Sequence, residues 1–588
     1  MQASPLLLAT LRALARTPLV AGNGLSLGGP ATGDAALDRS AVIVSGAARD
    51  MSRLRAWAVE AALLVGLGVL ALVVRLPNFM LIPAFSDEVE DVYRGYLITQ
   101  GKLLPLTDTS TYIGSLWDWM VAGAFWVSGF NLAAPRMLIL VLGVLTVLAT
   151  YLLGRTWGGL RGGLVAGYLL VTAGIHIVIN SHVAWANCMT PLFSTLGIWS
   201  LYVAVRGGPM KPPTALLFSG LCWGLAVQTH PIVMALGPGA GLFLLWQGRP
   251  LLRTRWPYLA AGLGVLVNSN LLVYNLITGF DSVAYARFIA ADYAGYEPLT
   301  PLIYIGRLAL ASVMMLQSLG GAVDLRDSDL DALSDPALWP VSLLALGGMV
   351  WQWRRGNQLP GLVLASALLI IPIFNAKYRL ILNARYVAPL LPISFAAVGA
   401  LLAAGYERLS HMAASRPRSG ATLPELAQLL LDLAAVFLVL HPLIYLRTLY
   451  DEVPRVGTIN APIFQALDRI KLNRRNGEVV VIDQALRGVE IWRGGGSVDH
   501  SFELALALEG VPFRFARIDS VAEMRDPRRR CRDQIVVLAP RLTWLSTEII
   551  DTLDLRDLDH GPSPRAPSEY SLFGLYRLDR PPDAPPDC

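Results

Sequence analysis

The run "LGVLTVLATYLLGRTWGGLRGGLVAGYLL", residues 142–170, consists of two apolar stretches separated by a short basic turn. Its only charged residues are Arg155 and Arg161. A helix needs roughly 20 apolar residues to cross a bilayer, and arginines concentrate in the cytoplasmic loops of membrane proteins. The pattern therefore predicts two membrane spans joined by a short cytoplasmic turn.

The same pattern recurs along the whole chain of 588 residues, which is 54% hydrophobic and only 15% charged. Soluble proteins carry about 25% charged residues, so this is a membrane protein. Basic clusters beside the apolar runs account for most of the net charge of +5 and indicate topology rather than nucleic-acid binding. We predict about eleven spans, with the N-terminus in the cytoplasm and the C-terminus outside. They lie near residues 56–75, 136–155, 161–179, 188–206, 214–230, 232–247, 257–275, 337–353, 359–375, 386–405 and 426–446.

Two further apolar stretches are predicted to lie outside, as interfacial helices rather than spans. Residues 112–130 fall within an external loop, 77–134, and contain Asp118 between two tryptophans. Residues 303–319 precede the acidic run "DLRDSDLDALSD". Trp and a charged residue on a short apolar helix are typical of the membrane interface.

The two ends of the chain differ from its apolar middle. Short β-branched runs such as "EVVVID" and "QIVVLA" alternate with polar helical stretches after residue 446, which predicts a small extracytoplasmic α/β domain over 447–580. The membrane domain then covers 53–446. Residues 1–52 are interpreted as disordered or as a non-native extension, and 581–588 as a disordered tail.

The stretch "AFSDEVEDVYRG", residues 84–95, places four carboxylates within five positions beside the first span. One acid is enough to cap a helix, and Glu90 can pair with Arg94 at i+4. Capping leaves the remaining acids without a purpose next to a membrane surface. The density of acid favours a functional role for this stretch, while a simple helix cap stays an alternative.

Several stretches together resemble one family. "SDEVEDVYRGYLITQGK", "HIVINSHVAWANCMTPLF" and "NARYVAPLLPISFAAVGALL" are similar to segments of the GT39 branch of GT-C membrane glycosyltransferases. This branch includes relatives of protein O-mannosyltransferases and of the lipid A aminoarabinose transferase. The resemblance covers roughly 55–405.

The resemblance implies transfer of a sugar, with inversion, from a polyprenyl-phosphate donor to a protein, lipid or polysaccharide acceptor at the outer face of the plasma membrane. It implies that Asp87 is the general base or orients the acceptor, since a carboxylate can accept the proton of an attacking hydroxyl. Glu88 is expected to be its partner. No cofactor is required, because a monophosphate donor has no diphosphate to bridge, although Asp87 and Glu88 could hold a divalent metal.

A leaving phosphate calls for cations, and the predicted external loop "NAKYRLILNARY" supplies them. The candidates for binding the donor phosphate are Lys377, Arg379, Arg385 and Tyr386, of which Arg385-Tyr386 matches the Arg-Tyr pair of the family. The alternative is that the basic residues only snorkel to the membrane interface.

Weaker candidates for a substrate cavity come from ends of spans and from the external loop. The candidates are His182, Asn187, His230, Trp117, Asp118 and Lys102. Structural alternatives are that the histidines belong to the core, that the tryptophan anchors the helix at the interface and that the lysine is only solvated.

Two other functions remain open from the sequence. A transporter or flippase of lipid-linked sugars would need ionisable residues near mid-membrane, of which few are present. A membrane-anchored sensor or scaffold would not need so many spans. An assay that measures sugar transfer and lipid translocation separately would distinguish a transporter or flippase from a glycosyltransferase.

Overall fold

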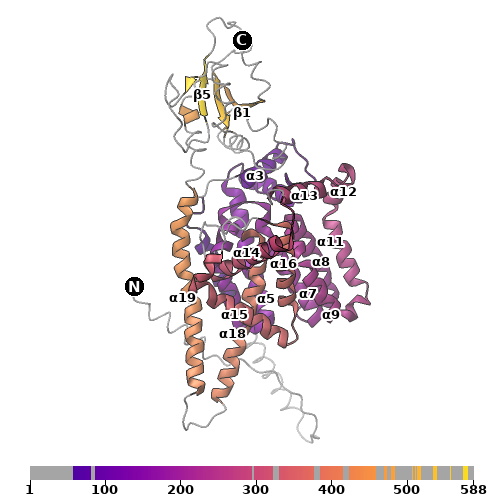
Figure 1. Cartoon of the computed structure of the whole chain (residues 1–588), viewed down its shortest axis with the longest axis vertical. Helices are drawn as coiled ribbons and strands as arrows, with labels where there is room; N and C mark the ends of the chain where they lie inside the picture. The colour runs from indigo at the N-terminus through magenta and orange to yellow at the C-terminus, as the bar shows by residue number, and fades with distance from the viewer. Residues whose placement is uncertain are drawn as a thin grey trace, which may run out of the picture. The chain divides into compact units, whose positions relative to one another are not determined.

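The structure is a computed structural model, and most of it is helical (Figure 1). The residues it describes are 57–80, 86–293, 297–321, 330–376, 384–414, 423–457, 469–472, 478–483, 506, 510–511, 513–517, 534–539, 556–557 and 574–579. The terminal segments predicted to be disordered, 1–52 and 581–588, lie outside these ranges.

The first described helix runs from Trp57 to Arg75. The helices of the first half that follow it are α3 (Ser86–Thr99), α4 (Leu116–Ser128), α5 (Ala133–Thr172), α6 (Gly174–Ile177), η1 (Val178–His182), η2 (Ala186–Met189), α7 (Thr190–Arg206), α8 (Pro212–Thr229), η3 (Pro231–Ala235), α9 (Gly237–Gln247), α10 (Arg249–Leu252), α11 (Trp256–Val267), α12 (Ser269–Thr278) and α13 (Asp281–Tyr293). Those of the second half are α14 (Pro301–Gly320), η4 (Leu330–Ser334), η5 (Pro336–Leu338), α15 (Trp339–Arg354), α16 (Leu359–Phe374), η6 (Ala384–Tyr386), η7 (Ala388–Leu390), α18 (Leu391–Ala414) and α19 (Leu423–Gly457).

Helix α5 is in fact a hairpin of two helices, as the opening sequence pattern predicts. Its backbone leaves the helical conformation at Gly158 and Gly159, and Gly159 has a φ of 64°, which favours glycine. On either side of this turn, Gly154 lies against Gly162 and Ala166, so the two halves approach closely through small residues. Small residues at such contacts let helices in a membrane pack backbone to backbone.

Helix α18 packs against the same hairpin, and this contact yields a test of the fold. A Cβ on Gly399 would lie 2.2 Å from the carbonyl oxygen of Gly162. We expect Gly399→Ala to lower the free energy of unfolding by about 1–3 kcal/mol, because backbone would have to move. Thermal unfolding in detergent measures this. Gly262→Ala is the matched control, since a Cβ there meets no atom within 4 Å; equal melting temperatures for the two variants would contradict the packing.

The predicted polytopic, mainly α fold is confirmed, and each predicted span falls on a helix or on a run of consecutive helices. Six described helices are long and apolar enough to cross a membrane, and α11 with α12 forms a further candidate bent by 60°. Helix α14, predicted to be interfacial, is one of the six by its length and composition. Helix α4, in contrast, has 13 residues and is too short to cross.

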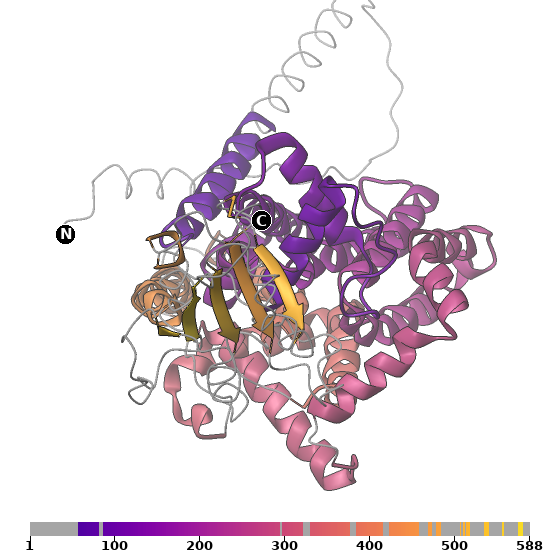
Figure 2. The ribbon, with the colours of Figure 1, turned by 90° about the horizontal axis from the view of Figure 1, so that it is seen from above.

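The C-terminal strands form one sheet, in which they lie side by side (Figure 2). Its order is β2 (Phe513–Arg517), β1 (Glu478–Asp483), β3 (Gln534–Ala539), β5 (Gly574–Leu578) and β4 (Arg556–Asp557). Strand β1 pairs in parallel with both β2 and β3, and parallel neighbours require crossover connections, as in the predicted α/β domain. Of the β1–β2 connection the structure describes only Leu506 and residues 510–511, and the β1–β3 crossover otherwise lies outside the described residues apart from β2. Helix α19 continues to Gly457, so the predicted boundary at 446 falls inside a helix.

Candidate active site

The acidic stretch forms the first two turns of α3, and the structure separates its carboxylates by role. Glu88 is buried and accepts two hydrogen bonds from the guanidinium of Arg136, with Nε–Oε1 and Nη2–Oε2 distances of 2.7 and 2.8 Å. Its Oε1 also accepts the backbone N–H of Ala184 at 3.0 Å. Both oxygens of Glu88, which is predicted to be catalytic or metal-binding, thus serve a buried ion pair. Asp87 lies in the first turn of α3, and its side chain is outside the described part.

This ion pair should matter for stability rather than for chemistry. We expect Glu88→Ala to lower the free energy of unfolding by about 3–5 kcal/mol, because it leaves the buried charge of Arg136 unpaired. Chemical unfolding in detergent measures the loss. The double variant Glu88→Ala/Arg136→Met should recover part of it, since the unpaired charge is then gone. A Glu88→Ala protein that is fully stable but cannot turn over would restore a chemical role to Glu88.

A short extended segment, residues 183–186, runs along α3; we call it the strap. Val183 and Trp185 both have extended backbone angles, with φ of −138° and −132°. In extended chain, alternate N–H groups point the same way. The amides of Ala184 and Ala186 accordingly both face α3. The Ala184 N–H donates to Glu88, and the Ala186 N–H donates to Asp91 Oδ2 at 3.1 Å. Two acids at i and i+3 on one helix face thus hold the strap in place.

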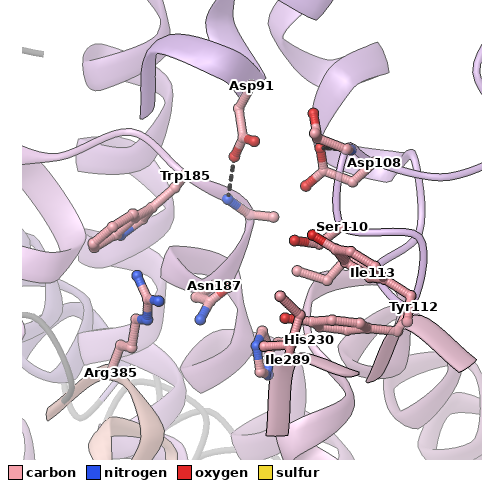
Figure 3. A pocket seen from close by; sticks show the side chains of 13 residues that line it. Asp91, Asp108, Ser110, Tyr112, Ile113, Trp185, Asn187, His230, Ile289 and Arg385 are labelled. Carbon is pink, nitrogen blue, oxygen red and sulfur yellow. Dashed lines mark hydrogen bonds between the residues drawn. The ribbon is translucent and has the colours of Figure 1, made fainter. Parts of the chain in front are cut away.

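A pocket opens beside Asp91 and the strap, with about 560 Å³ of space including the part open to solvent. Figure 3 shows Asp91 at one end, Trp185 and Arg385 on one side, and the loop residues from Asp108 to Ile113 on the other. It is therefore built by segments far apart in the chain. The lining residues are Asp91, Asp108, Thr109, Ser110, Tyr112, Ile113, Trp185, Ala186, Asn187, His230, Tyr285, Ile289 and Arg385.

Arg385, in η6, brings a positive charge to this pocket. Its guanidinium carbon lies 4.3 Å from the centroid of the Trp185 ring and 5.2 Å from that of Tyr386. Its Nη2 also donates a hydrogen bond to the Tyr386 hydroxyl at 3.3 Å. Of the four residues predicted to bind phosphate, Arg385 thus lines the pocket and Tyr386 supports it, whereas Lys377 and Arg379 lie outside the described residues.

His230 occupies the break between α8 and η3 and is electrically neutral. Its Nδ1 accepts the backbone N–H of Ile232 at 3.0 Å, which requires an unprotonated nitrogen there. The ring of His230 stands 5.7 Å from that of Tyr386. At physiological pH, His230 therefore offers the pocket a polar ring without a charge.

A cluster of carboxylates adjoins the pocket. Oxygens of Asp91, Asp108 and Asp118 lie within 4.8 Å of one another, an arrangement that could hold a metal ion. Arg94 lies against them, with its Nε 3.0 Å from Asp118 Oδ2 and 3.7 Å from Asp108 Oδ1. Burial acts to lower the pKa of Arg94, but Asp118 and Asp108 outweigh it, and the pKa rises above its usual value. Arg94 thus already supplies positive charge to the cluster.

The remaining cavity candidates divide between the pocket and the core. Asn187 and His230 line the pocket. His182 does not: it is buried, its Nε2 lies 2.9 Å from the carbonyl oxygen of Pro77, and burial lowers its pKa. Trp117 is a core residue rather than an interface anchor or a groove residue, since only 1% of it is exposed.

Two further candidates also lie away from the pocket lining. Asp118 is fully buried beside Arg94, so it acts on the pocket at most through the carboxylate cluster. Lys102 is exposed in the loop after α3, as expected of a solvated lysine.

Sequence reasoning missed the wall that carries Asp108, Ser110 and Tyr112. One side-chain and one backbone hydrogen bond hold this loop: Asn270 Nδ2 donates to the backbone carbonyl of Leu106 at 2.7 Å, and the backbone N–H of Gly114 donates to the backbone carbonyl of Gln228 at 3.0 Å. The Tyr112 ring also stacks on Tyr285 of α13, with centroids 5.8 Å apart. No spacing in the sequence signals these partners, because they lie on other helices.

Comparisons with known proteins agree with this architecture. Residues 115–274 match the family described as dolichyl-phosphate-mannose-protein mannosyltransferase. No curated protein matches the chain by sequence.

Two solved structures have a similar fold. ArnT from Cupriavidus metallidurans bound to undecaprenyl phosphate superposes with a TM-score of 0.55 at 13% identity, covering 90% of this chain and 99% of that one. The apo form of the same protein superposes with a TM-score of 0.52 at 13% identity, covering 87% of this chain and 97% of that one. The predicted GT-C fold is therefore confirmed.

Proposed function

We propose that this chain, a multi-pass membrane glycosyltransferase of the GT-C fold, transfers a sugar from a polyprenyl-phosphate donor to an acceptor at the outer face of the membrane. The observation that carries the proposal is one pocket that joins a carboxylate of α3 to the guanidinium of Arg385 across aromatic side chains. The fold relative that was crystallised with undecaprenyl phosphate supports a lipid phosphate as the carrier of the sugar.

Arg385 is proposed to receive the donor phosphate. A guanidinium can offer two parallel N–H bonds to phosphate oxygens, and it stabilises charge that develops as the phosphate leaves. The guanidinium lies over the Trp185 ring, and its planar fork of N–H groups suits bidentate contact with phosphate oxygens. Lys377 and Arg379 are proposed to assist from the neighbouring segment.

Asp87 is proposed as the general base. It precedes Asp91 by four residues on α3, so both occupy one face of the helix, and Asp91 lines the pocket. In the reaction, the acceptor oxygen forms a bond to the anomeric carbon while the bond from that carbon to the phosphate oxygen breaks. The hydroxyl proton passes to Asp87, and the polyprenyl phosphate leaves with the bonding electron pair. A single displacement of this kind inverts the anomeric centre.

The polar wall of the pocket is proposed to hold the sugar. Asp91 and Asp108 can accept hydrogen bonds from hydroxyl groups, Ser110 can donate one, and Tyr112 can pack on a sugar face. We propose that no divalent metal is required, because the donor has one phosphate and Arg94 brings a positive charge to the carboxylate cluster.

Topology completes the proposal. With α14 kept at the outer interface, placing the basic loops in the cytoplasm puts the N-terminus inside and the C-terminal strands outside, where they could select the acceptor. The identity of donor and acceptor can be measured together. Mass spectrometry of cell-envelope glycoconjugates should show one sugar modification that disappears when the gene is deleted and returns with the wild-type chain. Identical glycoconjugates in both cells would count against the proposal.

A further inference from the structure

The strap between η1 and η2 links the acidic helix to the arginine of the pocket. Its two alanine amides bind Glu88 and Asp91, while the Trp185 ring, which lies between these alanines in sequence, stacks on Arg385. Trp185 is itself almost completely buried, with 3% of its surface exposed. Its backbone and its side chain are thus both fixed.

We propose that Trp185 is a positioning residue that holds the guanidinium of Arg385 in the orientation that binds the donor phosphate. This inference rests on the proposed function. An arginine side chain has four rotatable bonds and loses substantial conformational freedom when it binds an anion. Contacts with both the Trp185 and the Tyr386 rings restrict Arg385 beforehand, so that less conformational freedom is lost when it binds the phosphate.

The strap explains why Trp185 can do this and a tryptophan on a mobile loop could not. Glu88 is tied to Arg136 by two hydrogen bonds, so the amide of Ala184 is attached to an immobile carboxylate. Asp91 fixes the amide of Ala186 on the other side of Trp185. The strap therefore fixes the position of Arg385 relative to α3. It thereby fixes the distance between the proposed phosphate site and the acidic helix.

The experiment measures binding of undecaprenyl phosphate to the purified full-length protein by native mass spectrometry. Trp185→Leu keeps an apolar side chain but has no aromatic face, and we expect about tenfold weaker binding, typical of a lost cation–π contact that is shielded from water. Trp185→Phe keeps a ring and should stay close to the wild type. Both variants keep the strap amides; Trp185→Leu leaves a cavity and should melt at a lower temperature than the wild type, but both should be folded at the temperature of the binding assay.

A double-mutant cycle separates positioning from general packing. If Trp185 acts through Arg385, Trp185→Leu should have little further effect in an Arg385→Lys background, where the planar group is gone. An equal loss in both backgrounds would overturn the proposal, because Trp185 would then act independently of the arginine. A loss in Trp185→Phe as large as that in Trp185→Leu would overturn it too.

A matched control exists in α15. At the C-terminal end of this helix, the guanidinium carbon of Arg355 lies 4.5 Å from the centroid of the Trp351 ring. The corresponding distance between Arg385 and Trp185 is 4.3 Å. Trp351→Leu should leave the binding of undecaprenyl phosphate unchanged. Failure of the proposed function would look different: the wild-type protein itself would bind no more undecaprenyl phosphate than its Arg385→Ala variant, whatever stands at 185.

Discussion

Replacing Asp87 by asparagine is expected to lower kcat by roughly 10²–10⁴-fold, the usual contribution of a positioned general base. The amide has nearly the shape of the carboxylate but cannot take the proton of the acceptor hydroxyl. Because Asp87 is proposed to act on the acceptor and not on the phosphate, donor binding should change little. Steady-state transfer from a labelled polyprenyl-phosphate sugar measures kcat. Equilibrium binding of undecaprenyl phosphate measures the affinity for the donor lipid.

Asp91→Asn is the matched control for this prediction. It makes the same chemical change one turn further along the same helix face, and the asparagine oxygen can still accept the N–H of Ala186. We expect a clearly smaller loss of kcat. If Asp91→Asn abolished transfer and Asp87→Asn did not, the base would be Asp91, and the assignment of Asp87 would be wrong.

Arg385→Ala is expected to reduce kcat/KM by roughly 10²–10³-fold, the cost of losing a group that stabilises developing negative charge. The variant removes the cation that lines the pocket and leaves the Trp185 and Tyr386 rings without their guanidinium partner. Arg385→Lys keeps the charge but not the planar fork, and should fall between the wild type and alanine.

Arg355→Ala is the control for Arg385, because it removes another arginine that stacks on a tryptophan, at a site on α15. Its kcat/KM should equal that of the wild type. An Arg385→Ala protein with full activity at limiting donor concentration would contradict the assignment of the phosphate site.

The membrane architecture was largely predictable because length, apolarity and arginine position are local properties of the sequence. The α5 hairpin illustrates this, since two apolar runs and a basic glycine turn lie within one stretch. Helix α14 shows the limit of such reasoning. An amphipathic interfacial helix and a span have similar composition, and its 20 residues satisfy the length of a span although acidic loop residues follow it.

Three residues of the pocket lining, Asn187, His230 and Arg385, were predictable, because they lie at the ends of predicted spans or match a family pattern. Glu88 and Asp91 could not be told apart from Asp87 by helical spacing, because their partners, Arg136 and Ala186, lie elsewhere in the chain. The wall around Asp108 and the strap around Trp185 are loops without periodicity. The roles of these two loops depend on contacts with residues far away in the sequence, and no local pattern in the sequence predicts such contacts.

The central claim is tested most directly by purified protein in lipid vesicles that contain a polyprenyl-phosphate sugar with a labelled sugar, together with cell-envelope extract as the source of acceptor. Both the labelled product and the released polyprenyl phosphate are quantified. The account predicts that label moves to an acceptor and that one polyprenyl phosphate is released for each sugar transferred, with both signals lost in Asp87→Asn. Label that reaches the opposite leaflet still attached to its lipid would show a translocator and contradict the account.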